Sequence, residues 1–99
     1  MDKINIMDLI KSNLSETLNG TITSEELVER SEKILYVDDT QQSINDNLSF
    51  EERSLLEDIS AQWDLHLDNS YDIDILKNLD FGIVKFPRAY LKDWYKQTL

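Results

Sequence analysis

The sequence contains no cysteine and only one histidine, one proline and two glycines. The lack of cysteine excludes disulfide bonds and thiolate metal sites. Scarce glycine and proline argue against a β-sandwich or barrel, in which each chain reversal needs special backbone angles. No apolar run approaches the roughly 18 residues of a membrane span, and residues 1–6 do not resemble a secretory signal. We therefore expect a cytoplasmic protein that makes no membrane contact.

The residues that catalysis and cofactor binding require are also scarce. A catalytic site needs a nucleophile, a base and orienting groups, and the single histidine, His66, falls on the apolar side of a predicted helix. We find no glycine-rich phosphate loop, dinucleotide fingerprint or zinc spacing. The acidic stretch that begins at Asp68 fails as an EF-hand, because its sixth position is Ile73 and not glycine. The sequence therefore predicts no enzyme activity, no metal and no cofactor.

Hydrophobic residues recur with helical spacing along most of the chain. They make up 40% of the 99 residues, which is enough for one folded domain over residues 1–99. The periodicity and the capping signals predict helices at about 3–18, 23–36, 49–67, 73–79 and 87–97, with a polar loop over 38–48. Residues 81–86 have a strand-like composition but no evident partner strand. The predicted fold is all-α, a compact bundle of four to five helices.

The apolar stripes of three helices define the expected core. The first consists of Ile6, Leu9, Ile10, Leu14 and Leu18, the third of Leu55, Leu56, Ile59, Trp63 and Leu67, and the last of Tyr90, Leu91, Trp94 and Tyr95. In the second helix, Glu26–Arg30 and Glu29–Lys33 are spaced as i,i+4 ion pairs. These pairs would neutralise the acids of that helix locally.

The net charge of −10 is distributed unevenly. Residues 38–80 contain 12 acids and 2 bases, whereas residues 81–99 contain 1 acid and 4 bases. An acidic surface repels nucleic acid and anionic lipid but attracts basic proteins. The bases Lys85, Arg88, Lys92 and Lys96 could complement the acidic middle of the chain or simply be solvated.

Acids without a basic neighbour concentrate on the third helix and after it. Asp64 and Asp68 are one turn apart on the side opposite the apolar stripe, and Tyr71 lies within the acidic stretch that follows. The predicted partner-binding residues are Glu57, Asp64, Asp68, Tyr71, Asp72 and Asp74. The alternatives are that these acids form only a solvated face and that Tyr71 belongs to the edge of the core.

The order of features from residue 6 to about 67 resembles the small immunity proteins of the colicin D type. An apolar first helix, Ile-Met-Asp-Leu-Ile at 6–10, precedes Leu-Asn-Gly-Thr-Ile-Thr-Ser-Glu-Glu-Leu at 18–27. A polar loop follows, and then a helix that carries Ser-Ala-Gln-Trp-Asp at 60–64. Residues 81–99 match nothing in that group. The resemblance implies an acidic helical bundle that binds the basic active-site surface of a nuclease toxin, a tRNase, without touching nucleic acid itself.

Two other functions share much of this physical chemistry. A phage-type nucleic-acid mimic would place carboxylates in two rows, like duplex phosphates, and would block a host nuclease. An acidic adaptor bundle would bind a partner without inhibiting it.

Overall fold

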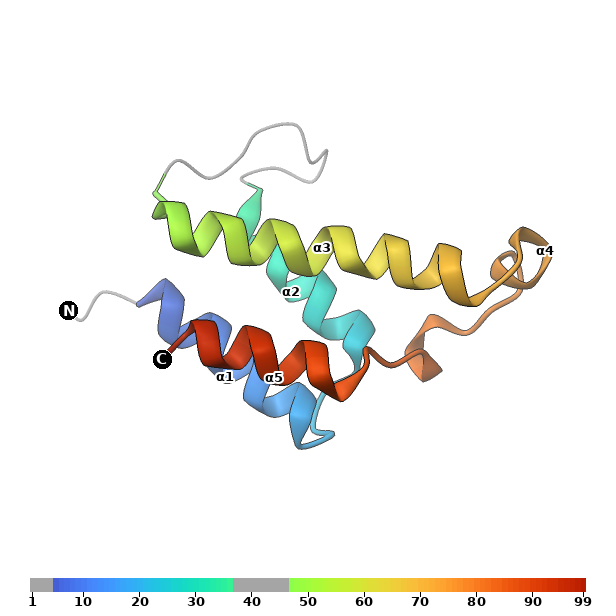
Figure 1. Ribbon diagram of the computed structural model, residues 1–99, viewed down its shortest axis with the longest axis horizontal. Coiled ribbons are helices and arrows are strands. Elements are labelled where there is room, and N and C mark those ends of the chain that lie inside the picture. Colours follow the sequence, from blue (N-terminus) through green and yellow to red (C-terminus); the bar gives the residue numbers. More distant parts are fainter. Residues whose placement is uncertain (1–4, 37–46) are drawn as a thin grey trace.

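Helices build the fold, as the apolar periodicity predicted. The computed structural model describes residues 5–36 and 47–99. These residues form an all-α bundle (Figure 1) that consists of α1 (Ile6–Leu18), α2 (Ser24–Leu35), α3 (Phe50–Ser70), α4 (Ile73–Leu76), the 3₁₀ turn η1 (Phe81–Ile83) and α5 (Arg88–Gln97). The predicted start of the first helix at residue 3 and most of the loop at 38–48 lie outside the described residues.

Side-chain caps fix where the long helices begin. Thr23 Oγ1 accepts the backbone N–H of Glu26 at 3.1 Å. At α3 the capping box is complete, because Ser49 Oγ accepts the N–H of Glu52 and the Glu52 carboxylate accepts the N–H of Ser49. Both caps satisfy donors that a helix start leaves without a partner. The predicted helix starts near Thr23 and Ser49 are confirmed. Of the capping box that the spacing of Thr23 and Glu26 predicts, the structure shows the bond to Thr23 Oγ1.

The helices pack so that α2 bridges the two sides of the bundle. It lies against α3 on one side and α1 on the other, and α1 also packs against α5 (Figure 1). The molecule measures 47 × 30 × 21 Å, and α3 runs along its longest axis. Arg30 links α2 to α1, since its Nη1 contacts Glu16 Oε2 at 2.9 Å and Asn13 Oδ1 at 3.2 Å.

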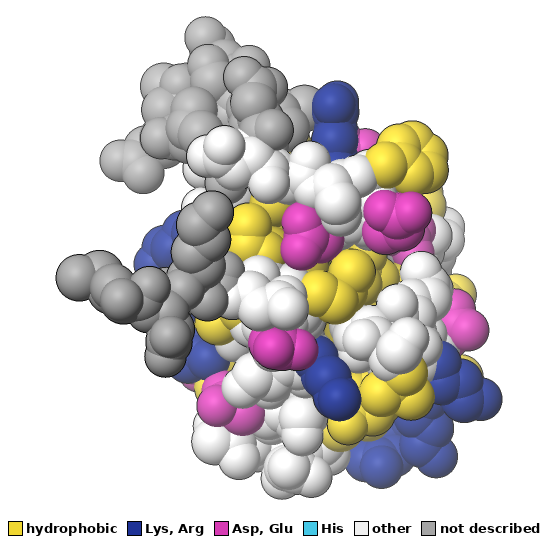
Figure 2. All heavy atoms as spheres, turned by 90° about the vertical axis from the view of Figure 1, so that its left-hand side faces the viewer, with side chains coloured by type: hydrophobic (Ala, Val, Ile, Leu, Met, Phe, Trp, Pro, Cys, Tyr) yellow, Lys and Arg dark blue, Asp and Glu magenta, His cyan; other side chains and the backbone are white. Residues whose placement is uncertain are grey.

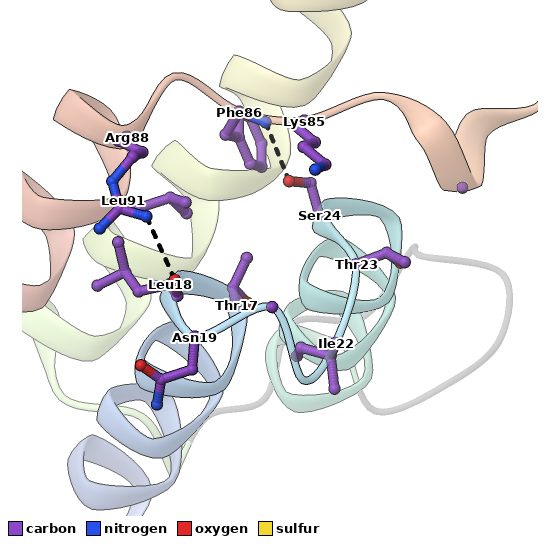
Figure 3. Close-up of a pocket in the computed structure, with 12 residues that line it drawn as sticks. Thr17, Leu18, Asn19, Ile22, Thr23, Ser24, Lys85, Phe86, Arg88 and Leu91 are labelled. Atoms are coloured by element: carbon purple, nitrogen blue, oxygen red, sulfur yellow. Dashed lines mark hydrogen bonds between the residues drawn. The ribbon is translucent and has the colours of Figure 1, made fainter.

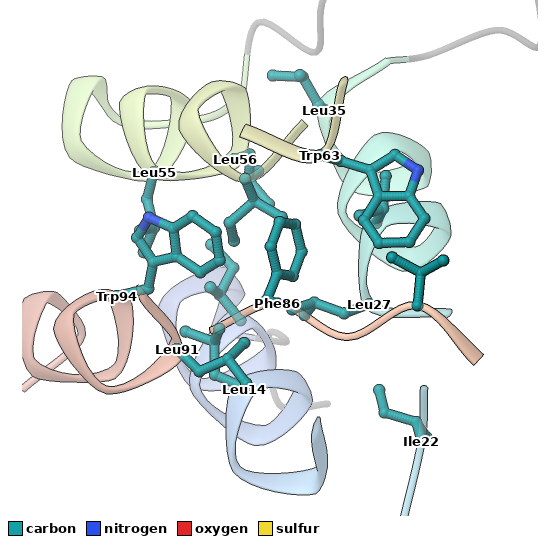
Figure 4. Close-up of a cluster of buried hydrophobic side chains, with 14 residues drawn as sticks. Leu14, Ile22, Leu27, Leu35, Leu55, Leu56, Trp63, Phe86, Leu91 and Trp94 are labelled. Atoms are coloured by element: carbon teal, nitrogen blue, oxygen red, sulfur yellow. The ribbon is translucent and has the colours of Figure 1, made fainter. Parts of the chain in front are cut away.

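Aromatic rings close the core between α3 and α5. Phe86 lies between Trp63 and Trp94 (Figure 4), with ring centroids 5.3 and 5.0 Å away and both contacts edge-to-face. The Trp94 indole N–H donates to Asp58 Oδ2 at 2.7 Å, so its polar atom is satisfied at the edge of the core. The predicted α3 stripe is confirmed from Leu55 to Trp63, since Leu55, Leu56, Ile59 and Trp63 are all buried. Its last member, Leu67, is partly buried against the core.

Residues 81–86 form no helix beyond η1 and pair with no strand among the described residues. The chain is extended after η1, and Val84 and Phe86 insert into the core. The backbone N–H of Phe86 donates to Ser24 Oγ at 2.9 Å, which ties this segment to the first turn of α2. The strand-like composition therefore reflects a buried connection that a side chain holds in place.

The structure corrects five predictions about individual elements. Leu9 and Tyr90, both expected in the core, are 38% and 44% exposed. Leu9 lies at the edge of the buried face of α1, which consists of Ile10, Asn13, Leu14 and Thr17. Thr17 Oγ1 donates to the backbone carbonyl of Asn13, and Asn13 Oδ1 accepts from Arg30 Nη1. Neither i,i+4 pair expected in α2 forms: Arg30 reaches across to Glu16, and no ion pair joins Glu29 to Lys33 within the described residues. The third helix ends at Ser70, not near 67, because partly buried Tyr71 donates its N–H to Leu67 and adds a turn.

Candidate partner-binding surface

The C-terminal third of α3 and the short α4 project beyond the bundle (Figure 1). Trp63 is the last buried residue of α3, and no residue from Asp64 to Ile83, a stretch described throughout, is buried. We call residues 64–76 the acidic arm, because they contain four aspartates and neither lysine nor arginine. The arm thus exposes more of its side chains than the rest of α3 does.

The aspartates of the arm have no partner in the described part of the chain. Asp64, Asp68, Asp72 and Asp74 are all exposed. The ion pairs among the described residues are Arg30–Glu16 and Arg53–Glu57, and none of the four aspartates makes a side-chain hydrogen bond there. No cation of the described residues therefore compensates their charges.

The position of Asp68 adds to the cost of this arrangement. It lies in the last turn of α3, which carries no basic residue. A helix C-terminus has a partial negative charge, so an anion there destabilises the helix by about 0.3–1 kcal/mol. Asp64, one turn earlier on the same face, adds like-charge repulsion of a few tenths of a kcal/mol. Neither carboxylate therefore gains helix stability from its position.

Two of the six predicted site residues differ from the four aspartates. Glu57 lies outside the arm, and its Oε1 accepts from Arg53 Nε at 2.9 Å, so it already has a cation from its own chain. Tyr71 is only partly exposed and packs against the core. The alternative that Tyr71 is a core-edge residue is confirmed, and the structure brings together Asp64, Asp68, Asp72 and Asp74 along one arm.

Three exposed aliphatic residues of the arm escaped the sequence-based prediction. Leu65, Ile73 and Ile75 are 50%, 72% and 50% exposed. Leu65 lies opposite the core stripe of α3, so its position on the helix could have revealed it. The sequence predicted a short helix over residues 73–79. The helix forms as α4, but none of its residues is buried.

The bases of the C-terminal segment do not neutralise the arm. Lys85, Arg88, Lys92 and Lys96 are exposed and form no ion pair within the described residues. Arg88 Nη1 makes only a long contact, 3.4 Å, with the carbonyl of Leu18. Figure 2 views the end of the molecule opposite the arm and shows the largest group of Lys and Arg at the side that α5 occupies. Within 5–36 and 47–99, these bases pair directly with none of the acids of the middle segment.

A pocket of about 390 Å³ lies between the end of α1, the start of α2 and residues 82–91 (Figure 3). Lys85 and Arg88 line the pocket, together with Thr17, Thr23 and Ser24. Its lining includes no Asp, Glu, His or Cys. The pocket therefore holds no carboxylate or imidazole to act as a general base.

The described residues form neither a metal-binding group nor a membrane-spanning helix. Over 5–36 and 47–99, no group of three His, Cys, Asp or Glu side chains could hold a metal ion. No helix in these ranges combines the length and apolarity needed to cross a membrane.

Comparisons with family models, curated proteins and solved structures find no significant match to this chain. The resemblance to colicin D-type immunity proteins stays a prediction.

Proposed function

We propose that this protein is an immunity protein that binds and blocks the basic active-site surface of a cognate nuclease toxin, a tRNase by the resemblance described above. The observation that carries the proposal is the acidic arm, whose four exposed aspartates have no cation from the described chain. A nuclease must present Lys and Arg to phosphate oxygens. Carboxylates held on a helix can pair with those same groups and occupy the place of the RNA.

The pocket beside α2 has no carboxylate or imidazole in its lining, and His66 packs at the core edge, with its ring centroid 6.2 Å from that of Phe86. The net charge of −10 would also speed the encounter with a basic domain through electrostatic steering. The proposed role of the protein is thus competitive occupation of a phosphate-binding surface.

The test begins with the gene neighbourhood, where we expect a nuclease toxin gene directly upstream, and continues as an inhibition titration with the nuclease domain of that toxin. We expect tRNA cleavage to stop at roughly a 1:1 ratio of the two proteins. Because charges steer the encounter, the association rate should fall about tenfold or more between roughly 0.05 and 0.5 M salt. Undiminished cleavage in the presence of about tenfold excess protein would contradict the proposal.

A further inference from the structure

The acidic arm carries an apolar component as well as a charge. Within residues 64–75, the exposed aliphatics Leu65, Ile73 and Ile75 alternate with the four aspartates. Leu65 precedes Asp68 by three positions, so both side chains lie on the outer face of α3. In α4 and its cap, the order is Asp72-Ile73-Asp74-Ile75. Pure solvation of the arm would not require half-exposed or largely exposed leucine and isoleucine side chains.

We infer that Leu65, Ile73 and Ile75 supply apolar contacts of the interface, and that the partner is a protein whose Lys and Arg side chains surround apolar surface. This inference rests on the proposed function and specifies the partner surface. Interfaces combine a desolvated apolar centre with a polar rim. Aliphatic contacts exclude water from the surrounding carboxylate–cation pairs, which strengthens them.

Charge and apolar contact together favour a basic protein over a second copy of this chain, a nucleic acid or an anionic lipid as the partner of the arm. A second copy of the chain would bring four more aspartates and no Lys or Arg to the same arm, so like charges would face one another. Nucleic acid and anionic lipid are repelled for the same reason. A purely cationic groove would satisfy the aspartates but would leave the three aliphatic side chains without a contact. Only a basic surface that surrounds apolar surface complements both components.

The experiment compares charge-neutral variants for binding to the same nuclease domain. Ile73→Ser/Ile75→Ser should raise the Kd about 30-fold or more, mainly through faster dissociation, because buried aliphatic contacts are lost. The association rate and its salt dependence should stay within about twofold of wild type, since no charge changes. Phe50→Ser is the control, because Phe50 is 81% exposed at the opposite end of α3. It should leave the Kd unchanged.

Leu65→Ser provides a second variant that does not depend on the four-residue α4. We expect about a 5- to 10-fold rise in its Kd. If the double variant loses helix content, the Kd of Leu65→Ser alone tests whether the aliphatic side chains contact the partner. An unchanged Kd in the folded variants, with association still dependent on salt, would overturn the apolar contacts and leave the proposed function standing. A wild-type protein that fails to bind the nuclease domain would overturn both.

Discussion

The variant Asp64→Lys/Asp68→Lys is expected to bind the nuclease domain about 100-fold more weakly than wild type, or worse. Both residues are exposed on the outer face of α3, and neither has an ion pair in the described residues. Reversal replaces two attractions to the partner's cations by two repulsions, which affects both the association rate and the stability of the complex. Surface plasmon resonance at two salt concentrations measures both effects.

The matched control applies the same change of net charge outside the arm. Glu29→Lys/Asp93→Lys alters two exposed acids, in α2 and α5, and gives the same net charge as the arm variant. If Asp64 and Asp68 pair directly with cations of the partner, the control should weaken binding much less than the arm variant does. Equal losses in the two variants would mean that only the overall charge steers the encounter and that the arm is not the interface.

The arm variant should also fold at least as well as wild type. Asp68 lies in the last turn of α3, where a lysine complements the helix dipole and an aspartate opposes it. The expected gain in the free energy of unfolding is about 0.3–1 kcal/mol. A variant that gains stability and loses binding identifies a residue whose charge serves the partner and not the fold.

Phe86→Ala is expected to lower the free energy of unfolding by about 3–5 kcal/mol. Phe86 is 3% exposed and makes edge-to-face contacts with both Trp63 and Trp94, so its removal leaves a cavity between α3 and α5. A loss of this size is a large part of the stability of a domain of about 100 residues. Urea denaturation followed by far-UV circular dichroism measures it.

Phe50→Ala is the matched control for this substitution. The residue type and the change are the same, but Phe50 is 81% exposed on the first turn of α3. We expect a change within about 0.5 kcal/mol. Similar losses in both variants would mean that residues 84–86 do not insert between the helices.

Local signals made most of the helices predictable. The capping box at Ser49 and Glu52 and the apolar stripe of α3 involve residues three or four positions apart, and the sequence displays such spacing directly. Residues 81–86 could not be assigned, because the hydrogen bond from Phe86 to Ser24 joins positions 62 apart. Arg30 was misassigned for the same reason, since two glutamates compete for it and only the packing of α1 on α2 favours Glu16.

The candidate site was predictable in its charge but not in its contacts. The concentration of aspartate between 64 and 74 is a property of composition, and it pointed to the arm. Burial depends on how far α3 projects beyond the bundle, so neither the partial burial of Tyr71 nor the exposure of Ile73 and Ile75 could be derived from spacing. Apolar residues near a helix end are ordinarily expected to pack on the core, and here the helix passes beyond it.

Carboxyl labelling of the complex tests the central claim most directly. Carbodiimide coupling of glycine ethyl ester, read out by mass spectrometry, reports how accessible each acid is in the free protein and when the nuclease domain is bound. We expect Asp64, Asp68, Asp72 and Asp74 to react readily in the free protein and to become protected in the complex, while Glu29 remains reactive. Four aspartates that stay fully reactive in a saturated complex would contradict the account.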